Sequence, residues 1–339
     1  MTKIIEKKEK QYAETKKNTI NASNARKNAS KNVSENVSKS VSLDTLAQLT
    51  PNLKNSGLEK LTKRAKAKHL TNAYTQRLAL LNSPLKKSYN NTFYGCCTSL
   101  IQQEDKITSK YCNNRWCIVC NRIRTAKMIN EYYPILTELK DKHFVTLTVP
   151  NIPGVLLRWQ IKDMIKKTQL IVKQIRKTKE LKGLRKLECT INLFTRHFHP
   201  HFHFVVEGEH IAKEIVQRWL KMNPDASPKA QDIRSADDGT MLELFKYFSK
   251  IISKDTIHVK SLDKIFCAMR GLRVYQPLGI KKVSEDIDGL QSERYDIEKL
   301  EAVWEWFEKD WYNKDTGEEL TGYEPSDTVL ELINNIITR

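Results

Sequence analysis

Four histidines occupy every second position of one short stretch, TRHFHPHFHFVV, and make up half of the 8 histidines in the chain. In an extended strand, side chains two positions apart lie on the same face. His201 and His203 therefore share one face, while the phenylalanines beside them lie on the other. His197 and His199 have the same parity, but they precede Pro200, which cannot donate a ladder hydrogen bond and is predicted to mark the start of the strand.

A third metal ligand is expected from a neighbouring strand. The segment LRKLECTINLF, just before the histidine run, alternates as a strand does, and the short connection predicts a hairpin. That hairpin carries Glu188 alongside His201 and His203. Two histidines and one carboxylate leave positions open for substrate oxygens, which indicates a catalytic ion. The alternative is that these are core or surface histidines that bind no metal.

The segment MLELFKYFSK supplies groups for phosphoryl transfer on a predicted helix. Glu243 and Tyr247 are four residues apart and share a helical face, and Lys250 lies three residues further on nearly the same side. A tyrosine oxygen can attack a phosphodiester, and a lysine can offset the developing negative charge. Taken alone, the pattern is weak and favours the alternative, an amphipathic helix with a partly buried tyrosine; the histidine strand is what favours a catalytic role.

Five of the 7 cysteines fall in the segment YGCCTSLIQQEDKITSKYCNNRWCIVC. Cys112, Cys117 and Cys120 follow the spacing C-x4-C-x2-C, and the adjacent pair Cys96 and Cys97 precedes them. A C-x2-C knuckle with a third and a fourth thiolate completes a closed tetrahedral shell, so we predict a structural zinc ion. The spacing leaves open which of Cys96 and Cys97 is the fourth ligand, and reduced, partly buried cysteines are the alternative.

The composition favours a polyanionic partner. The formal net charge is +18 and the pI is about 9.4, and each phosphate that Lys or Arg neutralises releases a counterion. No apolar run is long enough to cross a bilayer, and the first residues lack the apolar stretch of a secretory signal. We therefore expect a cytoplasmic protein that binds nucleic acid and not a membrane.

Hydrophobic periodicity predicts an α+β core. The expected order is a strand (142–151), a long amphipathic helix (154–177), the two strands of the histidine hairpin, a helix (209–222), a short strand (230–236) and a helix (240–254). This order favours a ferredoxin-like, or RRM-like, antiparallel sheet with flanking helices.

The remaining segments differ in composition. We expect five parts: a disordered basic tail (1–55), a basic helical segment (56–90), a Cys-rich zinc segment (91–135), the core (136–275) and an acidic, aromatic extension (276–339). Within the second part, the pattern from Leu58 to Leu81 predicts a helix that is either solvated or in contact with DNA. The turn residues KDTGE predict a hairpin in the extension.

Taken together, these segments resemble the replication initiator (Rep) proteins of rolling-circle plasmids, in the single-tyrosine branch of the HUH endonuclease superfamily. FVTLTVPN, HPHFHFVV and ELFKYFSK resemble the three family motifs in order. The segments GLRKLECT, CNNRWCIVC and AMRGLRVYQPLG are also similar to the family pattern, so the resemblance covers roughly residues 90 to 280. The extra HFH before the proline departs from that pattern.

The resemblance implies an enzyme that nicks one strand of plasmid origin DNA, which is single-stranded at the nick. It implies that Tyr247 forms a 5′-phosphotyrosyl bond and leaves a free 3′-OH for a host polymerase, with a host helicase as a further partner. His201, His203 and Glu188 would hold Mg²⁺ or Mn²⁺. Glu243 matches the glutamate that is thought to activate water in the terminating cleavage.

Two other hypotheses stay open at the level of sequence. One is a relaxase or transposase of the same superfamily, although the spacing of Glu243 and Tyr247 and the cysteine segment favour a replication initiator. The other is a zinc-containing DNA-binding regulator without catalysis, in which the histidines only support the fold.

Overall fold

The structure is a computed structural model that describes residues 57–103, 106–192, 194–245, 257–281 and 300–337. All of the elements described below belong to one unit, Leu49–Arg339. The predicted basic tail, residues 1–55, lies outside the described residues. None of the described helices combines the length and apolar character needed to cross a membrane.

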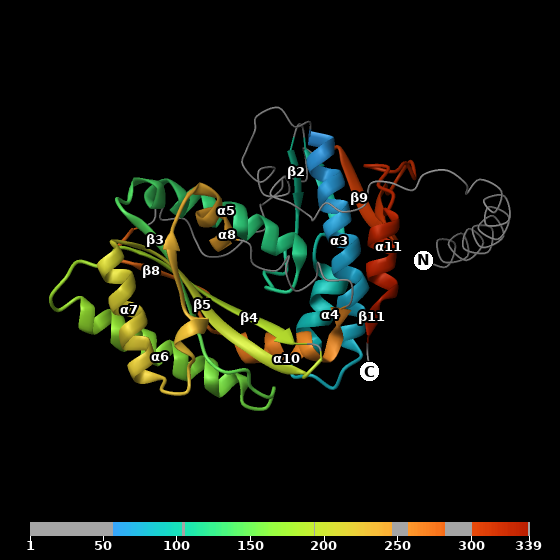
Figure 1. Ribbon diagram of the computed structural model, residues 1–339. Coiled ribbons are helices and arrows are strands. Elements are labelled where there is room, and N and C mark those ends of the chain that lie inside the picture. The colour runs from blue at the N-terminus through green and yellow to red at the C-terminus, as the bar shows by residue number, and fades with distance from the viewer. Residues whose placement is uncertain (1–56, 104–105, 193, 246–256, 282–299, 338–339) are drawn as a thin grey trace, which may run out of the picture. The chain divides into compact units, whose positions relative to one another are not determined.

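A five-stranded antiparallel sheet forms the centre of this unit, with the strand order β6-β3-β5-β4-β8 (Figure 1). Its strands are β3 (Lys142–Thr148), β4 (Gly183–Asn192), β5 (His197–Glu207), β6 (Asp232–Ser235) and β8 (Tyr275–Leu278). The chain passes from β3 through a helix to the β4–β5 hairpin, and through a second helix to β6. The predicted α+β class with an antiparallel sheet is therefore confirmed.

Helices cover both faces of this sheet (Figure 1). One face buries its apolar side chains, among them Leu187, Phe202 and Phe204, against α6 (Leu157–Ile175), α7 (Glu209–Met222) and α10 (Val259–Met269). The other face packs Phe144 and Val205 against α5 (Ile118–Glu138) and α8 (Asp238–Phe245). Alternating side chains along each strand thus serve two cores. The helices predicted at 154–177 and 209–222 are confirmed.

Pro200 does not begin its strand, contrary to the prediction. β5 starts at His197, and Pro200 lies within it opposite Cys189. Backbone N–H groups two residues apart point to the same side of a strand, and Phe198 exchanges both backbone hydrogen bonds with Ile152 on the side away from β4. The missing N–H of Pro200 therefore points toward the gap beyond the end of β3, where no ladder bond is lost.

The cysteine-rich segment belongs to a second, four-stranded sheet with the order β10-β9-β1-β2. Its strands are β1 (Ser99–Gln103), β2 (Lys106–Ser109), β9 (Ala302–Phe307) and β10 (Asp310–Asn313). The pairing of β1 with β9 joins segments about two hundred residues apart in sequence. The predicted KDTGE turn follows β10, where Asn313 donates its backbone N–H to the carbonyl oxygen of Glu318.

Two helices precede this sheet, α3 (Gly57–Ala79) and α4 (Lys86–Gly95). The helix predicted from Leu58 to Leu81 is confirmed, but α3 is not a solvated helix, because Tyr74 and Leu78 are fully buried in the main core. The remaining elements are β7 (Ile257–His258), α11 (Asp327–Asn334), β11 (Ile336–Ile337) and the short 3-10 helix η2 (Pro228–Ala230). β7 and β11 pair in parallel.

Candidate functional site

The histidine hairpin places three potential metal ligands on one face of the large sheet. Glu188 of β4 is directly opposite His201 of β5, and His203 lies two residues further along the same strand. One ligand atom from each residue lies within 4.8 Å of the other two. Glu188 and His201 are buried, and His203 is half-buried. The structure therefore brings together the three residues that the sequence nominates.

The hydrogen bonds around this site direct nitrogen lone pairs toward the carboxylate. Nδ1 of His201 lies 3.0 Å from the carbonyl oxygen of His199, which can only accept, so Nδ1 carries the proton. Nε2 of His201 then faces Oε2 of Glu188 at 3.3 Å. Two acceptors at this distance repel each other unless a proton or a metal ion lies between them. A backbone partner on the second ring nitrogen is typical of histidines that bind metals.

His203 completes the arrangement, because its Nε2 faces the same carboxylate oxygen as that of His201. Its Nε2 is 3.6 Å from Oε2 of Glu188, and its Nδ1 is 3.2 Å from the hydroxyl of Thr146 on β3. Ligands bound at about 2.1 Å to one ion lie about 3.0 to 3.4 Å apart, depending on the coordination angle. The donor set thus fits a divalent ion with little rearrangement, and water or substrate can fill the remaining positions.

A buried lysine sets the charge of this site. Lys186 is fully buried, lies on the same face of β4 two residues before Glu188, and forms an ion pair with Oε1 of Glu188. Burial alone would raise the pKa of Glu188, but Lys186, His201 and His203 together hold that pKa well below its usual range. Burial also lowers the pKa of His203. An ionised carboxylate beside a neutral imidazole is the protonation state that binds a metal.

The first two histidines of the run have different surroundings. Nδ1 of His197 lies 2.9 Å from the carbonyl oxygen of Thr195, within the hairpin connection. His199 stacks on His201 with ring centroids 5.1 Å apart, and its Nδ1 lies 2.8 Å from Oδ1 of Asn151. Neither belongs to the group of three ligand atoms. His199 therefore borders the site, and His197 lies outside it.

Of the three residues proposed for the reaction, only Glu243 lies within the described part of the chain, since Tyr247 and Lys250 fall outside it. Glu243 is on α8 and forms an ion pair with Arg234 of β6, with 3.2 Å between Nη2 and Oε2. Phe245, the last described residue of α8, packs against the face of the sheet that also carries the metal ligands. Phe245, two residues before Tyr247, is thus on the same face of the sheet as the metal ligands.

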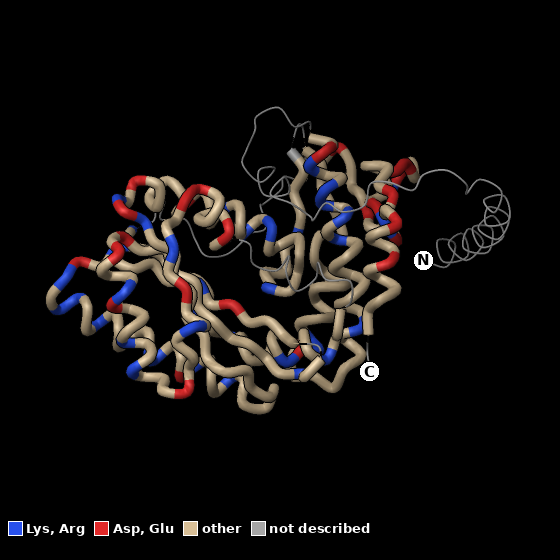
Figure 2. The backbone as a smooth tube through the Cα atoms, in the orientation of Figure 1, with Lys and Arg blue, Asp and Glu red and all other residues tan. Residues whose placement is uncertain are grey.

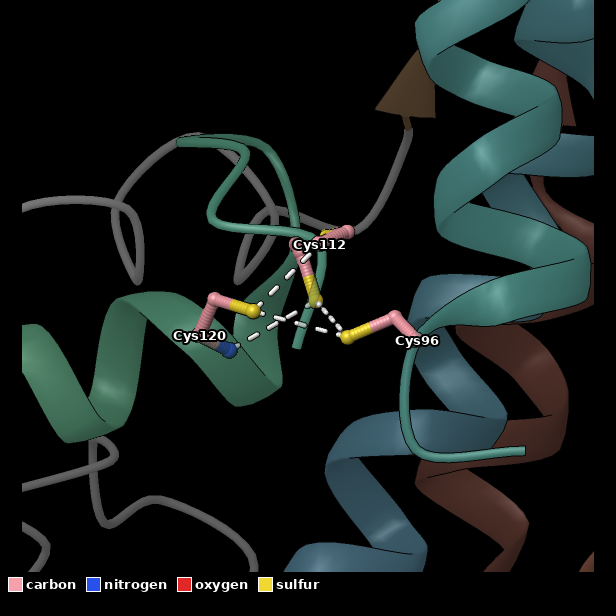
Figure 3. Close-up of side chains that lie close together, drawn as sticks. Cys96, Cys112 and Cys120 are labelled. Carbon is pink, nitrogen blue, oxygen red and sulfur yellow. Dashed lines mark hydrogen bonds between the residues drawn. The ribbon is translucent and has the colours of Figure 1, made fainter. Parts of the chain in front are cut away.

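A second cluster brings together Cys96, Cys112, Cys117 and Cys120, whose sulfur atoms all lie within 4.8 Å of one another. Figure 3 shows the side chains of Cys96, Cys112 and Cys120 directed toward one point. The distances between sulfur atoms are 3.5 Å for Cys96–Cys117, 3.4 Å for Cys96–Cys120 and 3.7 Å for Cys112–Cys120. Zn–S bonds of about 2.3 Å at tetrahedral angles separate the sulfurs by about 3.8 Å. The cluster can therefore bind zinc, with all four positions taken by protein.

The backbone conformation explains why Cys96, and not the adjacent Cys97, is the fourth member of the cluster. Cys97 has a φ of 51°, in the left-handed region, and its thiol is not part of the cluster. This turn lets Cys96 direct its sulfur at the other three residues. Elsewhere in the cluster, Cys117 caps the N-terminus of α5, and its sulfur accepts a hydrogen bond from the backbone N–H of Cys120. That bond fixes the C-x2-C knuckle.

The sequence reasoning missed two buried lysines, one beside each cluster. Lys186 shares the parity of Glu188 on β4, so the two-residue period of a strand already places both on one face. Lys68 of α3 is 1% exposed and donates to the carbonyl oxygen of Phe93 at 3.2 Å. Burial lowers the pKa of Lys68, while the nearby Cys96 opposes that shift. In the sequence, nothing distinguishes Lys68 from the other cations of its helix.

A family model supports the identity that these geometries suggest. The model, described as "Replication protein", matches residues 105–312, which is more than half of the chain. The match includes the hairpin with Glu188, His201 and His203, as well as α8 and three of the four clustered cysteines. No solved structure matches the chain significantly.

Three curated relatives carry the same name, Protein rep. The one from Staphylococcus aureus is 26% identical over 183 residues, covering 47% of this chain and 79% of the relative. The one from Streptococcus pneumoniae serotype 2 (strain D39 / NCTC 7466) is 28% identical over 172 residues, or 43% of this chain and 53% of the relative. The one from Bacillus amyloliquefaciens is 23% identical over 232 residues, or 56% and 68%.

Proposed function

Because this chain belongs to the replication protein family, we propose that it initiates rolling-circle replication of a plasmid by nicking one strand of the origin DNA. The observation that carries the proposal is the convergence of Glu188, His201 and His203, with 3.3 and 3.6 Å between the carboxylate oxygen and the two imidazole nitrogens. This arrangement lies on the face of the sheet against which α8 packs, and Phe245 of α8 is two residues before Tyr247.

In the proposed reaction, the phenolic oxygen of Tyr247 attacks a phosphorus atom of the origin strand. A P–O bond to tyrosine forms and the P–O3′ bond breaks, so the 5′ end becomes attached to the protein and a 3′-OH is released. The phenol loses its proton and the departing 3′ oxygen gains one. A host polymerase, with a host helicase opening the duplex, then extends the free 3′-OH.

Each residue of the site has a proposed task. Glu188, His201 and His203 would hold Mg²⁺ or Mn²⁺, which would supply Lewis-acid stabilisation of charge on the scissile phosphate. Lys186 keeps Glu188 ionised and fixes one of its oxygens. Lys250 offsets negative charge in the transition state, and Glu243 accepts a proton from water in the terminating cleavage.

The arrangement of the core supports a finer assignment of the fold. The element order β3-α6-β4-β5-α7-β6 and the strand order β6-β3-β5-β4 are those of a ferredoxin-like sheet, with β8 added at one edge. We propose this fold for residues 136–275, as an HUH endonuclease core. The segments 91–135 and 276–339 meet through the pairing of β1 with β9, and we propose that zinc holds that junction together.

A covalent-adduct assay tests the proposed reaction. The full chain is incubated with single-stranded oligonucleotides of a cognate plasmid origin and Mn²⁺, and adducts are separated on a denaturing gel. Wild type is expected to form an adduct that Tyr247→Phe cannot form. Tyr275→Phe is the matched control. Tyr275 of β8 is directly opposite Lys186 of β4, so its side chain lies on the face of the sheet that carries Glu188, His201 and His203. It is expected to retain the adduct.

Two results contradict the proposal in different ways. An adduct with Tyr247→Phe shows that another residue is the nucleophile, and peptide mapping then identifies it. The absence of any adduct from wild type, with oligonucleotides from every part of the plasmid, favours a zinc-containing DNA-binding regulator without catalysis. Cleavage at a transfer origin or a transposon end, but not at a replication origin, favours a relaxase or a transposase.

A further inference from the structure

A basic pocket lies on the opposite side of the large sheet from the candidate metal site. It has a volume of about 420 Å³ and is bounded by α6 and by the neighbouring strands β4 and β8, of which β8 is at the edge of the sheet. Its lining residues are Thr168, Gln169, Val172, Lys173, Arg176, Lys177, Arg185, Gln276, Pro277 and Leu278. Four of these ten residues are cationic and none is acidic. Figure 2 shows Lys and Arg recurring along the helix region that borders it.

Arg185, at the base of this pocket, is a buried cation with no counter-ion in the part of the chain that the structure describes. Only 3% of the residue is exposed, and its Nε has no hydrogen-bond partner. One guanidinium nitrogen donates to the hydroxyl of Thr168 at 2.8 Å, and the guanidinium carbon lies 4.7 Å from the ring centroid of Phe202. Among the described residues, no carboxylate contacts Arg185. Burial, together with nearby Arg273, lowers the pKa of Arg185 to about 10.

This arrangement is costly unless an anion completes it. A buried charge without an ion-pair partner destabilises the fold, and stacking on an aromatic ring offsets only part of that cost. The rim adds three exposed cations, Lys173, Arg176 and Lys177, none of which forms an ion pair within the described part of the chain. Repulsion among four cations disfavours the empty pocket, and a multiply charged anion relieves that repulsion.

We propose that this pocket binds the phosphate of a nucleotide. A guanidinium with a free donor binds a phosphate oxygen directly, and the rim cations neutralise its remaining charge. The volume is in the range of small-molecule sites, about 300 to 1,000 Å³, so a sugar or base fits beside the phosphate against Val172 and Leu278. The nucleotide is either free or one unit of a bound single strand, because both present the same phosphate chemistry.

The site stands apart from the proposed nicking reaction, because Arg185 points away from the face that carries Glu188. Its ligand is therefore tested without cleavage, by titrating the full chain with pyrophosphate, ATP and an oligothymidylate in the absence of added divalent metal. Calorimetry measures the first two ligands, and fluorescence anisotropy measures the third. A failure of the nicking proposal leaves these measurements intact.

The informative variant is the exposed double substitution Lys173→Gln/Arg176→Gln, which leaves the buried Arg185 in place. Its matched control is Lys162→Gln/Lys221→Gln, which removes two exposed charges that do not line the pocket. If the nucleotide is free, the pocket variant binds pyrophosphate and ATP at least tenfold more weakly than the control does. If the nucleotide is one unit of a single-stranded nucleic acid, the pocket variant instead binds oligothymidylate more weakly. The slope of log K for oligothymidylate binding against log salt concentration then falls by about 1.4, as expected for two lost contacts to a single strand.

A third variant probes the base of the pocket. Arg185→Lys keeps the positive charge but loses the planar fork of donors, so we expect at least fivefold weaker binding of the same ligand. Its melting temperature shows whether the variant is folded, and the rim variant decides the question if it is not. Equal affinities for the pocket and control variants, or no binding of any of the three ligands by wild type, overturns the proposal.

Discussion

The two candidate metal centres of this protein use different donors in different surroundings. The cysteine cluster supplies four sulfur atoms, with Cys96, Cys117 and Cys120 at most 1% exposed, so protein fills a tetrahedral shell. The histidine site supplies three ligands on a sheet that has its own hydrophobic cores. A closed shell has no room for substrate, whereas an incomplete shell on a stable support does.

This difference predicts opposite consequences for the loss of each metal. The cysteine cluster lies in a small core of its own, and three of its four cysteines are among the ten buried residues of that core. We expect the histidine site to add less to the stability of its sheet, because Lys186 forms an ion pair with Glu188 without a metal. Loss of the proposed zinc ion should therefore affect folding first, and loss of the proposed catalytic ion should affect the reaction alone.

The largest effect is expected for Cys120→Ser. Removing one thiolate opens the tetrahedral shell, and structural zinc contributes on the order of 10 kcal/mol in small zinc domains. We expect loss of bound zinc and a decrease of about 3 kcal/mol or more in the free energy of unfolding. Zinc content by mass spectrometry and denaturant unfolding measure the two quantities.

Cys97→Ser is the matched control for that experiment, since Cys97 is equally buried and adjacent to Cys96 but outside the cluster. It should retain one zinc ion per chain. If Cys97→Ser loses zinc and Cys96→Ser keeps it, the assignment of the fourth ligand is reversed.

The second prediction concerns His203→Ala, which removes one ligand of the histidine site. We expect cleavage of origin DNA to fall by at least about a hundredfold, because the scissile phosphate loses its Lewis acid. DNA binding, zinc content and melting temperature should change little. His197→Ala, on the same strand but outside the group of ligands, should cleave as wild type does. Equal losses of DNA binding and cleavage in His203→Ala would indicate that His203 has a structural role. The histidine site would then not differ from the cysteine cluster in this respect.

A third and more selective effect is expected for Glu243→Gln. If Glu243 activates water only in the terminating cleavage, the first formation of the tyrosine adduct stays normal. Release of that adduct by water slows by about 10² to 10⁴, the usual contribution of a general base. A time course of adduct formation and decay separates the two steps. Equal slowing of both steps would mean that Glu243 acts in the initial attack, or that it stabilises the position of α8 through its ion pair with Arg234.

Local rules explain how much of these sites could be predicted from the sequence. Strand parity places Glu188, His201 and His203 on one face, and helical periodicity predicts α6 and α7, because both patterns involve residues close in the chain. Lys186 was accessible to the same rule. The choice of Cys96 over Cys97 was not, since it depends on a left-handed backbone conformation that cysteine rarely adopts.

Long-range pairing accounts for the remainder. From composition, we predict that the acidic extension and the cysteine-rich segment are separate parts of the chain. In the structure, β9 of the extension pairs with β1, and the indole of Trp311 on β10 donates to the carbonyl oxygen of Cys97 at 2.8 Å. The position of Pro200 inside β5 also depends on a distant partner, because β3 ends before it and Ile152 pairs beyond it. Neither contact leaves a signal in the residues near it.

The smallest effect is expected at His199, which borders the histidine site. Here the question is whether keeping this imidazole neutral in the folded chain lowers the free energy of unfolding at acidic pH. Burial, with His201 and His203 nearby, lowers the pKa of His199 to about 4 from an ordinary value of 6.5. Above pH 6.5 His199 is neutral in both folded and unfolded chains. As the pH falls from 6.5 toward 4, the unfolded chain takes up a proton that the folded chain does not, so stability declines. Because His199 is partly exposed to solvent, we expect only about 1 kcal/mol. Urea unfolding of metal-free wild type and His199→Gln at pH 7 and pH 4.5 should show a smaller decline in the variant; an identical decline would mean that His199 does not contribute to it.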